Sequence, residues 1–285
     1  MSSCLVPHIV FDWFMVAATL AQAGDAFAPV SFCRGMCDAS AVAVLDGDRF
    51  VVGDDEDNIL RVYSRRAGGL PLHTFDLSPF LRVDPKSPEV DIEGAASLED
   101  RVYWISSHAQ NRNGKDALSR HRLFATTFQN HGGAVVIRPA GQPYSNLLTD
   151  LLEHAPLRGF DLSAAAQRAP KTRNALNIEG LCSTPEGHLL IGFRNPIPDG
   201  KALLVPLLNP AEVIEGNSAC LGRPRFLGLG GLGIRSLARA GDRYLIIAGS
   251  YDGESPSLLF EWRGGEDSPR PLPQVELAGF NPEAI

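Results

Sequence analysis

The sequence predicts an all-β protein, a β-propeller of five or six blades that carries a short helical insertion. Three observations indicate this fold class. A four-residue motif recurs along the chain, a pair of strand-like runs follows each of the first four copies, and the copies begin at intervals typical of propeller blades. We therefore expect a single domain over residues 31–285, in which each motif opens a blade.

The repeated motif has a polar, an apolar, a polar and a small residue, in that order. Successive copies start 53, 86, 56 and 48 residues apart, and all but the second interval match the length of a blade. The copies are Asp38-Ala-Ser-Ala, Asp91-Ile-Glu-Gly, Asn177-Ile-Glu-Gly, Gly233-Ile-Arg-Ser and Asn281-Pro-Glu-Ala.

A β-hairpin is expected after each of the first four motifs, because two apolar runs are separated there by a turn that contains Asp or Gly. The hairpins cover residues 41–55, 95–108, 181–194 and 237–250. A third run, rich in β-branched and aromatic residues, follows at 58–65, 121–128, 202–208 and 257–263. Each unit therefore supplies at least three antiparallel strands.

The long second interval contains apolar residues at helical rather than strand-like spacing. This spacing occurs in NLLTDLLEHA and LSAAAQRA and predicts a helical insertion near residues 144–170. The last motif ends just before the chain does, so we expect the closing strands of the ring to be missing at the C-terminus. The alternative is that residues 30–32 contribute a strand to an incomplete last blade.

Residues 1–30 precede the expected domain and are either disordered or weakly similar to a signal peptide. An apolar stretch covers residues 14–27, but no Lys or Arg precedes it, and it is too short to span a membrane. We expect a cytoplasmic protein, with a periplasmic or secreted one as the alternative. The five cysteines are then reduced thiols, and a disulfide between Cys33 and Cys37 is the alternative for an exported protein.

The formal net charge of −7 disfavours nucleic acid and anionic membranes as partners, because binding to both depends on clustered Lys and Arg. The chain lacks a G-x-S-x-G elbow, an H-E-x-x-H helix and a Walker lysine motif. Gly228, Gly230 and Gly233 fit the dinucleotide fingerprint, but a hairpin rather than a helix follows them. We expect no nucleotide or organic cofactor, and a small molecule or a protein as the partner.

The up-and-down path of a blade brings distant polar residues to one face of the propeller, because the start of the first strand lies beside the loop that joins the second and third strands. One group comes from the motifs and is expected near the central axis: Asp38, Glu93, Glu179, Arg235 and Glu283. The other group comes from the loops: Asp54, Asp55, Glu56, Asp57, Asn58, His108, Asn111, Lys115, Arg194, Asn195, Lys201, Ser250 and Asp252.

Carboxylates that converge on one axis repel each other unless a cation or an arginine neutralises them. Hard cations prefer oxygen ligands, so Ca²⁺ or Mg²⁺ is the expected ion, held by Glu93, Glu179, Glu283 and Asp38. The alternative is a structural network in which Arg235 neutralises the acids. The acidic stretch at 54–57 is expected to be a solvated loop, because its spacing does not match an EF-hand.

The remaining polar residues of this face are candidates for proton transfer and ligand binding. His108 and Glu93 are the candidate catalytic residues. Lys115 and Lys201 each follow a glycine, and they either bind an anion or only cap their loops. The candidate ligand-binding residues are Asn111, Lys115, Arg194, Asn195, Lys201 and Arg235.

Four long segments carry a resemblance to a known family: CDASAVAVLDGDRFVVGDDEDNILRVY, DIEGAASLEDRVYWISSHAQNRNGK, NIEGLCSTPEGHLLIGFRNPIPDGKALLVPLLNP and GIRSLARAGDRYLIIAG. Over residues 37–285 the chain resembles the uncharacterised bacterial family called domain of unknown function 3616. Members of that family usually continue past the last motif into a final hairpin, which this chain lacks. The resemblance implies no established activity.

The Glu-Gly pair before a strand is also similar to that of the gluconolactonase and regucalcin-type propellers and of phytase-like esterase propellers. In the first group the matching glutamate binds a divalent metal, which implies this role for Glu93 or Glu179. The proline that usually follows Glu-Gly is replaced here by Ala95 and Leu181.

These patterns predict a propeller that binds a small polar or anionic ligand, together with an axial divalent cation. If the protein is an enzyme, we expect metal-assisted hydrolysis of an ester, lactone or phosphoester, with Arg194 and Lys201 binding the negative charge of the substrate. The rival from another class is a non-catalytic protein-interaction propeller, in which the axial acids and Arg235 only hold the blades together.

Overall fold

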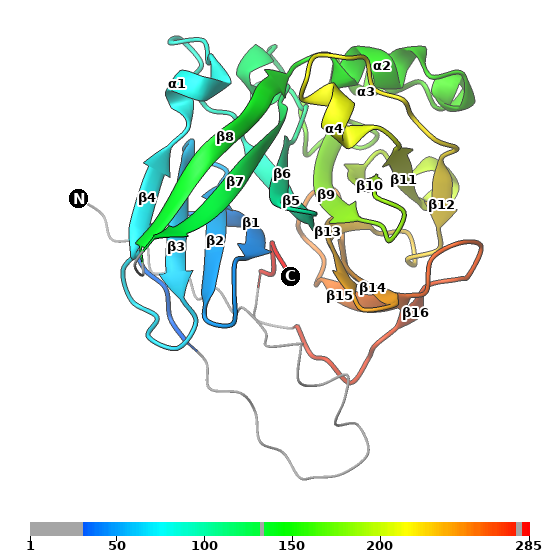
Figure 1. Ribbon diagram of the computed structural model, residues 1–285. Helices are drawn as coiled ribbons and strands as arrows, with labels where there is room; N and C mark the ends of the chain where they lie inside the picture. Colours follow the sequence, from blue (N-terminus) through cyan, green and yellow to red (C-terminus); the bar gives the residue numbers. More distant parts are fainter. Residues whose placement is uncertain (1–30, 132–133, 278–280) are drawn as a thin grey trace.

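The computed structural model describes residues 31–131, 134–277 and 281–285. These residues form four antiparallel sheets of four strands each, arranged around a common axis (Figure 1). The innermost strands β1 (Ala39–Val44), β5 (Ile92–Leu98), β9 (Asn177–Ser183) and β13 (Gly233–Ala240) neighbour one another in this order. The all-β propeller expected from the repeats is therefore confirmed.

Each sheet follows the chain outward from the axis, so that sequential strands pair by hairpins. The first blade continues with β2 (Arg49–Asp54), β3 (Ile59–Ser64) and β4 (His73–Asp76), and the second with β6 (Arg101–Ser106), β7 (Leu123–His131) and β8 (Ala134–Tyr144). The third continues with β10 (Leu189–Asn195), β11 (Ala202–Leu207) and β12 (Arg225–Leu227), and the fourth with β14 (Arg243–Gly249), β15 (Leu258–Trp262) and β16 (Arg270–Pro271).

The expected number of five or six blades is wrong for the described residues, which form four. The expectation counted copies of the motif, and the fifth copy, at 281–284, forms no strand. The C-terminus instead lies near β1 (Figure 1), and Ala284 and Ile285 line the same small cavity as Ser40 and Ser236. At the other end of the domain, the backbone of Cys33 forms an isolated β-bridge with Gly69 of the first blade. The N-terminal segment therefore does not add a strand to the last blade.

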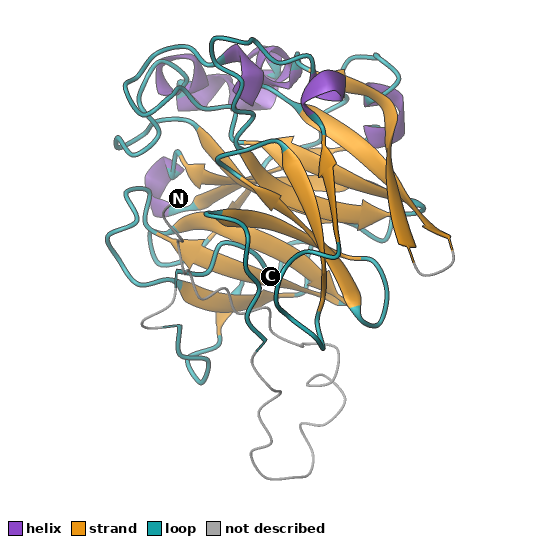
Figure 2. Cartoon of the chain, turned by 90° about the vertical axis from the view of Figure 1, so that its left-hand side faces the viewer, coloured by secondary structure: helices purple, strands orange, loops and turns teal. Residues whose placement is uncertain are grey.

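The helical insertion follows β8 and lies between the second and third blades. It comprises α2 (Leu147–Glu153), η2 (Ala155–Phe160) and α3 (Leu162–Ala165). Leu147, Leu151, Leu157 and Leu162 are buried in one cluster with residues of both blades, and this packing stabilises helices too short to form alone. In Figure 1 α2 and α3 lie at the upper end of the molecule, where Figure 2 shows most of the helices.

The other helices are single turns within the connections: α1 (Ser78–Leu81), η1 (Leu118–Arg120), η3 (Pro198–Gly200) and α4 (Pro210–Val213). The core between the blades is built from large apolar side chains of facing sheets. Trp104 is fully buried between the first two blades, where it stacks on Phe124 and its indole nitrogen donates to Thr126 Oγ1 at 2.9 Å.

A β-bulge occurs at the third residue of the motif in every blade. In each innermost strand one residue has no partner on the second strand, and these residues are Ser40, Glu93, Glu179 and Arg235. A bulge redirects the side chain of the extra residue. Ser40, Glu93 and Glu179 all line the axial cavity, so the repeated bulge presents the variable position of the motif to the axis.

Two other expectations concern the ends and the thiols of the chain. Residues 1–30, including Cys4, lie outside the described residues. Cys33, Cys37, Cys182 and Cys220 form no disulfide with one another. Within the described ranges, no helix is both long and apolar enough to cross a membrane.

Candidate functional site

Three carboxylates from two neighbouring blades meet beside the axis. Asp91 immediately precedes β5 with a left-handed backbone (φ 61°), Glu93 occupies the β5 bulge, and Asp55 follows β2. One oxygen from each carboxylate lies within 4.8 Å of the other two. We call Asp55, Asp91 and Glu93 the acidic triad.

Backbone hydrogen bonds bring the loops that follow the second strands to the motifs. The amide of Asp55 donates to the carbonyl oxygen of Asp38 at 3.1 Å, and the amide of Ser107 donates to that of Asp91 at 3.0 Å. The motif of one blade therefore sits beside its own second-to-third-strand loop, as the up-and-down topology requires.

Asp55 differs from Asp54 and Asp57 of its loop in having no basic partner among the described residues. Asp57 pairs with Arg61 at 2.5 Å, and Asp54 lies 3.8 Å from the same guanidinium and accepts from the amide of Cys37. Oδ1 of Asp55 is buried and has no hydrogen-bond donor among the described residues. The loop is thus not simply solvated, because one of its carboxylates faces the other acids.

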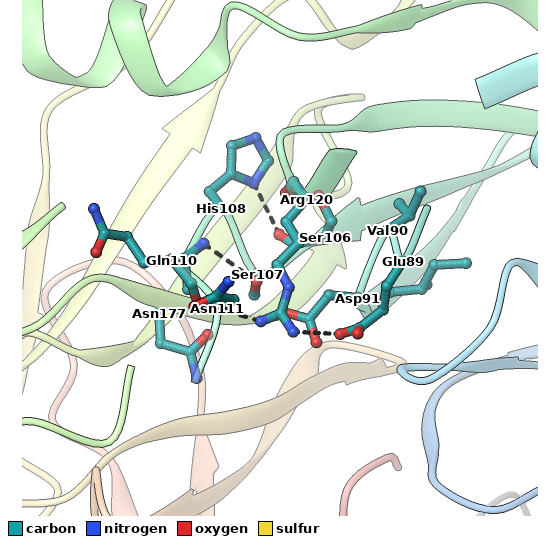
Figure 3. A network of polar contacts seen from close by, with 12 residues as sticks. Glu89, Val90, Asp91, Ser106, Ser107, His108, Gln110, Asn111, Arg120 and Asn177 are labelled. Atoms are coloured by element: carbon teal, nitrogen blue, oxygen red, sulfur yellow. Dashed lines mark hydrogen bonds and ion pairs between the residues drawn. The ribbon is translucent and has the colours of Figure 1, made fainter. Parts of the chain in front are cut away.

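Arg120 supplies the positive charge next to the triad. This residue of η1 donates from Nη1 to Asp91 Oδ2 at 2.8 Å, and its other terminal nitrogen pairs with Glu89 (Figure 3). The same Nη1 reaches the backbone oxygen of Gln110 at 3.4 Å. Arg120 therefore neutralises Asp91 and Glu89, while Asp55 and Glu93 form no ion pair with a basic residue in the described part of the chain.

Burial and mutual repulsion raise the pKa values of this cluster. Burial, followed by the charges of Asp38 and Asp91, raises the pKa of Asp55 to about 9. Burial, followed by the charge of Glu179, holds the pKa of Glu93 well above its ordinary value. Burial also raises the pKa of Asp91, although Arg120 opposes the shift. The triad thus either retains protons at neutral pH or requires a positive charge.

Glu179 lies across the axial cavity and is held between two arginines. Arg194 Nη1 donates to its Oε1 at 2.6 Å, and Arg235 Nε lies 3.7 Å from its Oε2. Asn177 Nδ2 also donates to Oε1, at 2.8 Å. Glu179 is only 3% exposed, and its Oε2 has no hydrogen-bond donor among the described residues. Oε2 therefore interacts with the charge of Arg235, whose Nε also has no hydrogen-bond partner among the described residues.

Glu283 completes the axial charges from the C-terminal motif. It pairs with Arg235, and Asn281 both accepts from Arg235 Nη1 at 2.7 Å and donates to Glu283 Oε1 at 2.6 Å. Burial raises the pKa of Glu283 to about 7, although Arg235 opposes the shift. The fifth copy of the motif thus joins the ion-pair network of blades three and four.

The structure does not bring His108 to the acids. Its Nδ1 lies 2.8 Å from the carbonyl oxygen of Ser106, its ring stacks on His121 with centroids 5.7 Å apart, and it points away from the Asp91–Arg120 pair (Figure 3). Burial, followed by the charge of His121, lowers its pKa to about 3. His108 is therefore a neutral, buried side chain whose geometry does not pair it with Glu93.

The other predicted ligand-binding residues divide between structural and exposed positions. Asn111 accepts from the amides of Asn113 and Lys115 and closes its turn, which leaves the Lys115 side chain exposed. Asn195 is 1% exposed and donates to the carbonyl oxygens of Pro170 and Thr172 at 3.3 and 2.8 Å. Lys201 is exposed beside η3.

The sequence reasoning selected Glu93 but missed Asp55 and Asp91 as its companions. Of the proposed metal ligands, Glu179 and Glu283 lie in the arginine network rather than in the triad, and Asp38 contributes its charge to the shift of Asp55. The sequence did contain a signal that could have identified Asp91. The first position of the motif is Asp in two copies and Asn in two others, so a side chain with a carboxylate or amide oxygen recurs there.

Comparisons with known proteins identify the family. The family described as protein of unknown function (DUF3616) matches residues 38–126 and 125–275. No curated protein matches the chain.

Several solved structures align with the chain at low sequence identity. A catalytically inactive virginiamycin B lyase from Staphylococcus aureus with quinupristin is 8% identical, covers 82% of this chain and 55% of its own, and gives a TM-score of 0.36. A protein of unknown function from Bacteroides thetaiotaomicron is 11% identical, with 87% and 45% covered and a TM-score of 0.39. Trypanosoma rangeli sialidase in complex with sialic acid is 10% identical, with 83% and 37% covered and a TM-score of 0.37. The chain thus spans about half the length of the first of these proteins.

Proposed function

The chain belongs to the DUF3616 family of proteins of unknown function, and we propose that in this protein the propeller binds a divalent cation at its axis and a small anionic ligand beside it. The observation that carries the proposal is the acidic triad, whose three carboxylate oxygens lie within 4.8 Å of one another. Oxygens on opposite sides of a bound Ca²⁺ lie roughly 4.8 Å apart, because each Ca–O distance is about 2.4 Å. No pair of the three oxygens is therefore farther apart than two ligands of one ion can be.

The charges around the triad favour a bound cation over a purely structural network of these acids. Buried polar atoms normally have hydrogen-bond partners, yet Oδ1 of Asp55 has no donor among the described residues. This oxygen is an acceptor, which a cation satisfies and a further carboxylate does not. Asp38 and Glu283 lie close enough to raise the pKa of Asp55, so they add negative potential around the ion.

Ca²⁺ and Mg²⁺ are the proposed ions, because the donor set consists of oxygen atoms without nitrogen or sulfur. Asp55, Asp91 and Glu93 would hold the ion, and solvent oxygens would complete its coordination. A bound divalent cation supplies Lewis acidity toward a substrate oxygen and lowers the pKa of bound water. The reaction class that suits this site is hydrolysis of an ester, lactone or phosphoester.

A specific observation also favours the non-catalytic alternative for part of the site. Glu179, Arg194, Arg235 and Glu283 form a continuous ion-pair network that links blades three and four to the C-terminal motif. Such a network holds blades together without any ligand. In the non-catalytic reading the propeller presents its loops to a protein, and the triad holds protons rather than an ion.

Isothermal titration of the chelator-treated protein with CaCl₂ and MgCl₂ separates the two readings. We expect one ion per chain, with affinity at least about tenfold weaker in Glu93→Gln and unchanged in Glu186→Gln. Glu186 is an exposed glutamate in the β9–β10 turn and controls for the loss of one charge. Binding that is absent in the wild type, or equal in Glu93→Gln, would contradict the cation site and leave the interaction propeller.

A further inference from the structure

A group of exposed basic residues lies on two loops, one of which begins beside the acidic triad, in a protein of net charge −7. It consists of two segments, the loop between β6 and β7 and the stretch that follows the helical insertion. Their exposed residues Arg112, Lys115, Arg168, Lys171 and Arg173 form what we call the basic rim. The clustering is unusual for this chain, which has only four lysines, two of them in the rim.

Packing contacts join the two segments into one surface. A side-chain carbon at Gly114 would lie 3.8 Å from the backbone nitrogen of Ala169, so the two loops lie close together at this point. The buried amide of Asn195 fixes the second segment by donating to Pro170 and Thr172. Asn111 fixes the turn that carries Lys115. The rim is therefore built on loops with defined backbones.

The charges of the rim are not neutralised within the described part of the chain. None of its five basic side chains forms an ion pair there, and Arg168 donates only to the carbonyl oxygen of Asn174 at 3.1 Å. The acid closest in sequence, Asp116, accepts from Gln110 Nε2 at 3.1 Å. In contrast, Arg120, Arg194 and Arg235 are all paired with acids. The positive charge of the rim is therefore available to bind a ligand.

The β6–β7 loop, which carries Arg112 and Lys115 of the rim, begins beside the acidic triad. The loop that carries Arg112 and Lys115 starts at Ser107, whose amide donates to Asp91, and Gln110 accepts from the guanidinium that holds Asp91. Figure 3 shows Gln110, Asn111 and Asn177 beside Arg120 and Asp91. An anion at the triad alone would be repelled, whereas a bound cation and the basic rim attract it together.

We propose that the basic rim and the axial cation together bind the phosphate group of a small phosphate-bearing ligand; this rests on the proposed cation site. A phosphate carries up to two charges and several acceptor oxygens, so one oxygen can reach the cation while others meet Lys and Arg. A net charge of −7 over the whole chain opposes a long polyanion such as nucleic acid, which would meet acidic surface beyond the rim.

The test measures binding of inorganic phosphate by isothermal titration, with and without saturating MgCl₂. The rim variant is Arg112→Gln/Lys115→Gln/Lys171→Gln/Arg173→Gln. Its control, Arg34→Gln/Lys86→Gln/Arg138→Gln/Arg263→Gln, removes the same four charges from exposed positions elsewhere. We expect phosphate affinity in Mg²⁺ to fall at least about tenfold in the rim variant and to change less than about twofold in the control. Mg²⁺ affinity without phosphate should be the same in all three proteins.

The outcomes distinguish this inference from the proposed function. Mg²⁺ binding with no phosphate binding, or with equal phosphate affinity in the rim variant, overturns the rim and leaves the cation site. Phosphate binding that is lost in the rim variant but needs no Mg²⁺ supports the rim and overturns its link to the cation. Failure to bind either Mg²⁺ or phosphate overturns both.

Discussion

Replacement of Glu179 by alanine should destabilise the protein strongly, because it leaves two buried arginines without their shared partner. Arg194 contacts the carboxylate at 2.6 Å and Arg235 at 3.7 Å, and the side chain of Glu179 is 3% exposed. Removing one partner from a buried ion pair costs about 3–5 kcal/mol. At roughly 2–4 °C per kcal/mol for a chain of this size, the melting temperature should fall by about 6–20 °C.

Thermal and urea unfolding followed by circular dichroism measure this loss. Glu179→Gln keeps an acceptor for Arg194 and should cost less, about 1.5–3 kcal/mol, the value of a hydrogen bond to a charged group. Adding Arg194→Met and Arg235→Met to Glu179→Ala should restore most of the loss, because no unpaired charge then remains buried. A loss below about 1 kcal/mol in Glu179→Ala would refute the view that this carboxylate holds the two arginines.

Three further predictions concern the triad, a close backbone contact and the core. Because the pKa of Asp55 is raised from 3.8 to about 9, the folded state keeps a proton that the unfolded chain releases, so the cation-free protein should lose stability as pH rises from about 4 to about 9. Melting temperatures at pH 5, 7 and 9 in chelator should show this fall, and Asp55→Asn should reduce it; an equal fall in both proteins would contradict the assignment. Gly233→Ala should cost about 3 kcal/mol or more in urea unfolding, since its Cβ would lie 1.9 Å from the backbone oxygen of Arg194, and a near-neutral effect would show that this contact is absent. Trp104→Phe should cost about 1–3 kcal/mol in the same assay, because Thr126 loses its buried donor, whereas a change within about 0.5 kcal/mol would count against that hydrogen bond.

Local periodicity was sufficient to predict the three inner strands of each blade and the helical insertion. The four hairpins and the third runs correspond to β1–β3, β5–β7, β9–β11 and β13–β15, because alternating apolar residues and turn residues act over a few positions. The outermost strands were not predicted. β4, β12 and β16 have four, three and two residues, too few for an alternating pattern to be recognised. β8 is longer, but Pro139, Gly141 and Pro143 interrupt its pattern.

The site was harder to predict, because it depends on which residues face the axis. The sequence placed Asp38 among the axial ligands, but the residue at the bulge of the first blade is Ser40, which donates to the carbonyl oxygen of Ile92 in the next blade. Glu93 and Glu179 occupy equivalent bulges and yet have different neighbours, since arginines flank only Glu179. These differences arise from contacts between blades, which no pattern within one repeat contains.

The sequence also could not distinguish Asp55 from the adjacent acids of its loop. Its neighbours Asp54 and Asp57 share Arg61 from β3, so the expectation of a solvated acidic loop fits part of the segment. Asp55 alone faces Asp91 and Glu93 of the next blade. The backbone path of the turn decides which of these carboxylates faces the next blade. A run of four acidic residues does not reveal that path.

The most direct test of the central claim is to locate a cation in crystals of the protein. Crystals soaked in MnCl₂, which occupies oxygen sites that bind Mg²⁺ or Ca²⁺, should give an anomalous difference peak among Asp55, Asp91 and Glu93. The peak should be absent in crystals of Glu93→Gln and present in Glu186→Gln. A wild-type crystal that shows no peak at the triad, or shows the ion elsewhere on the axis, would contradict the account.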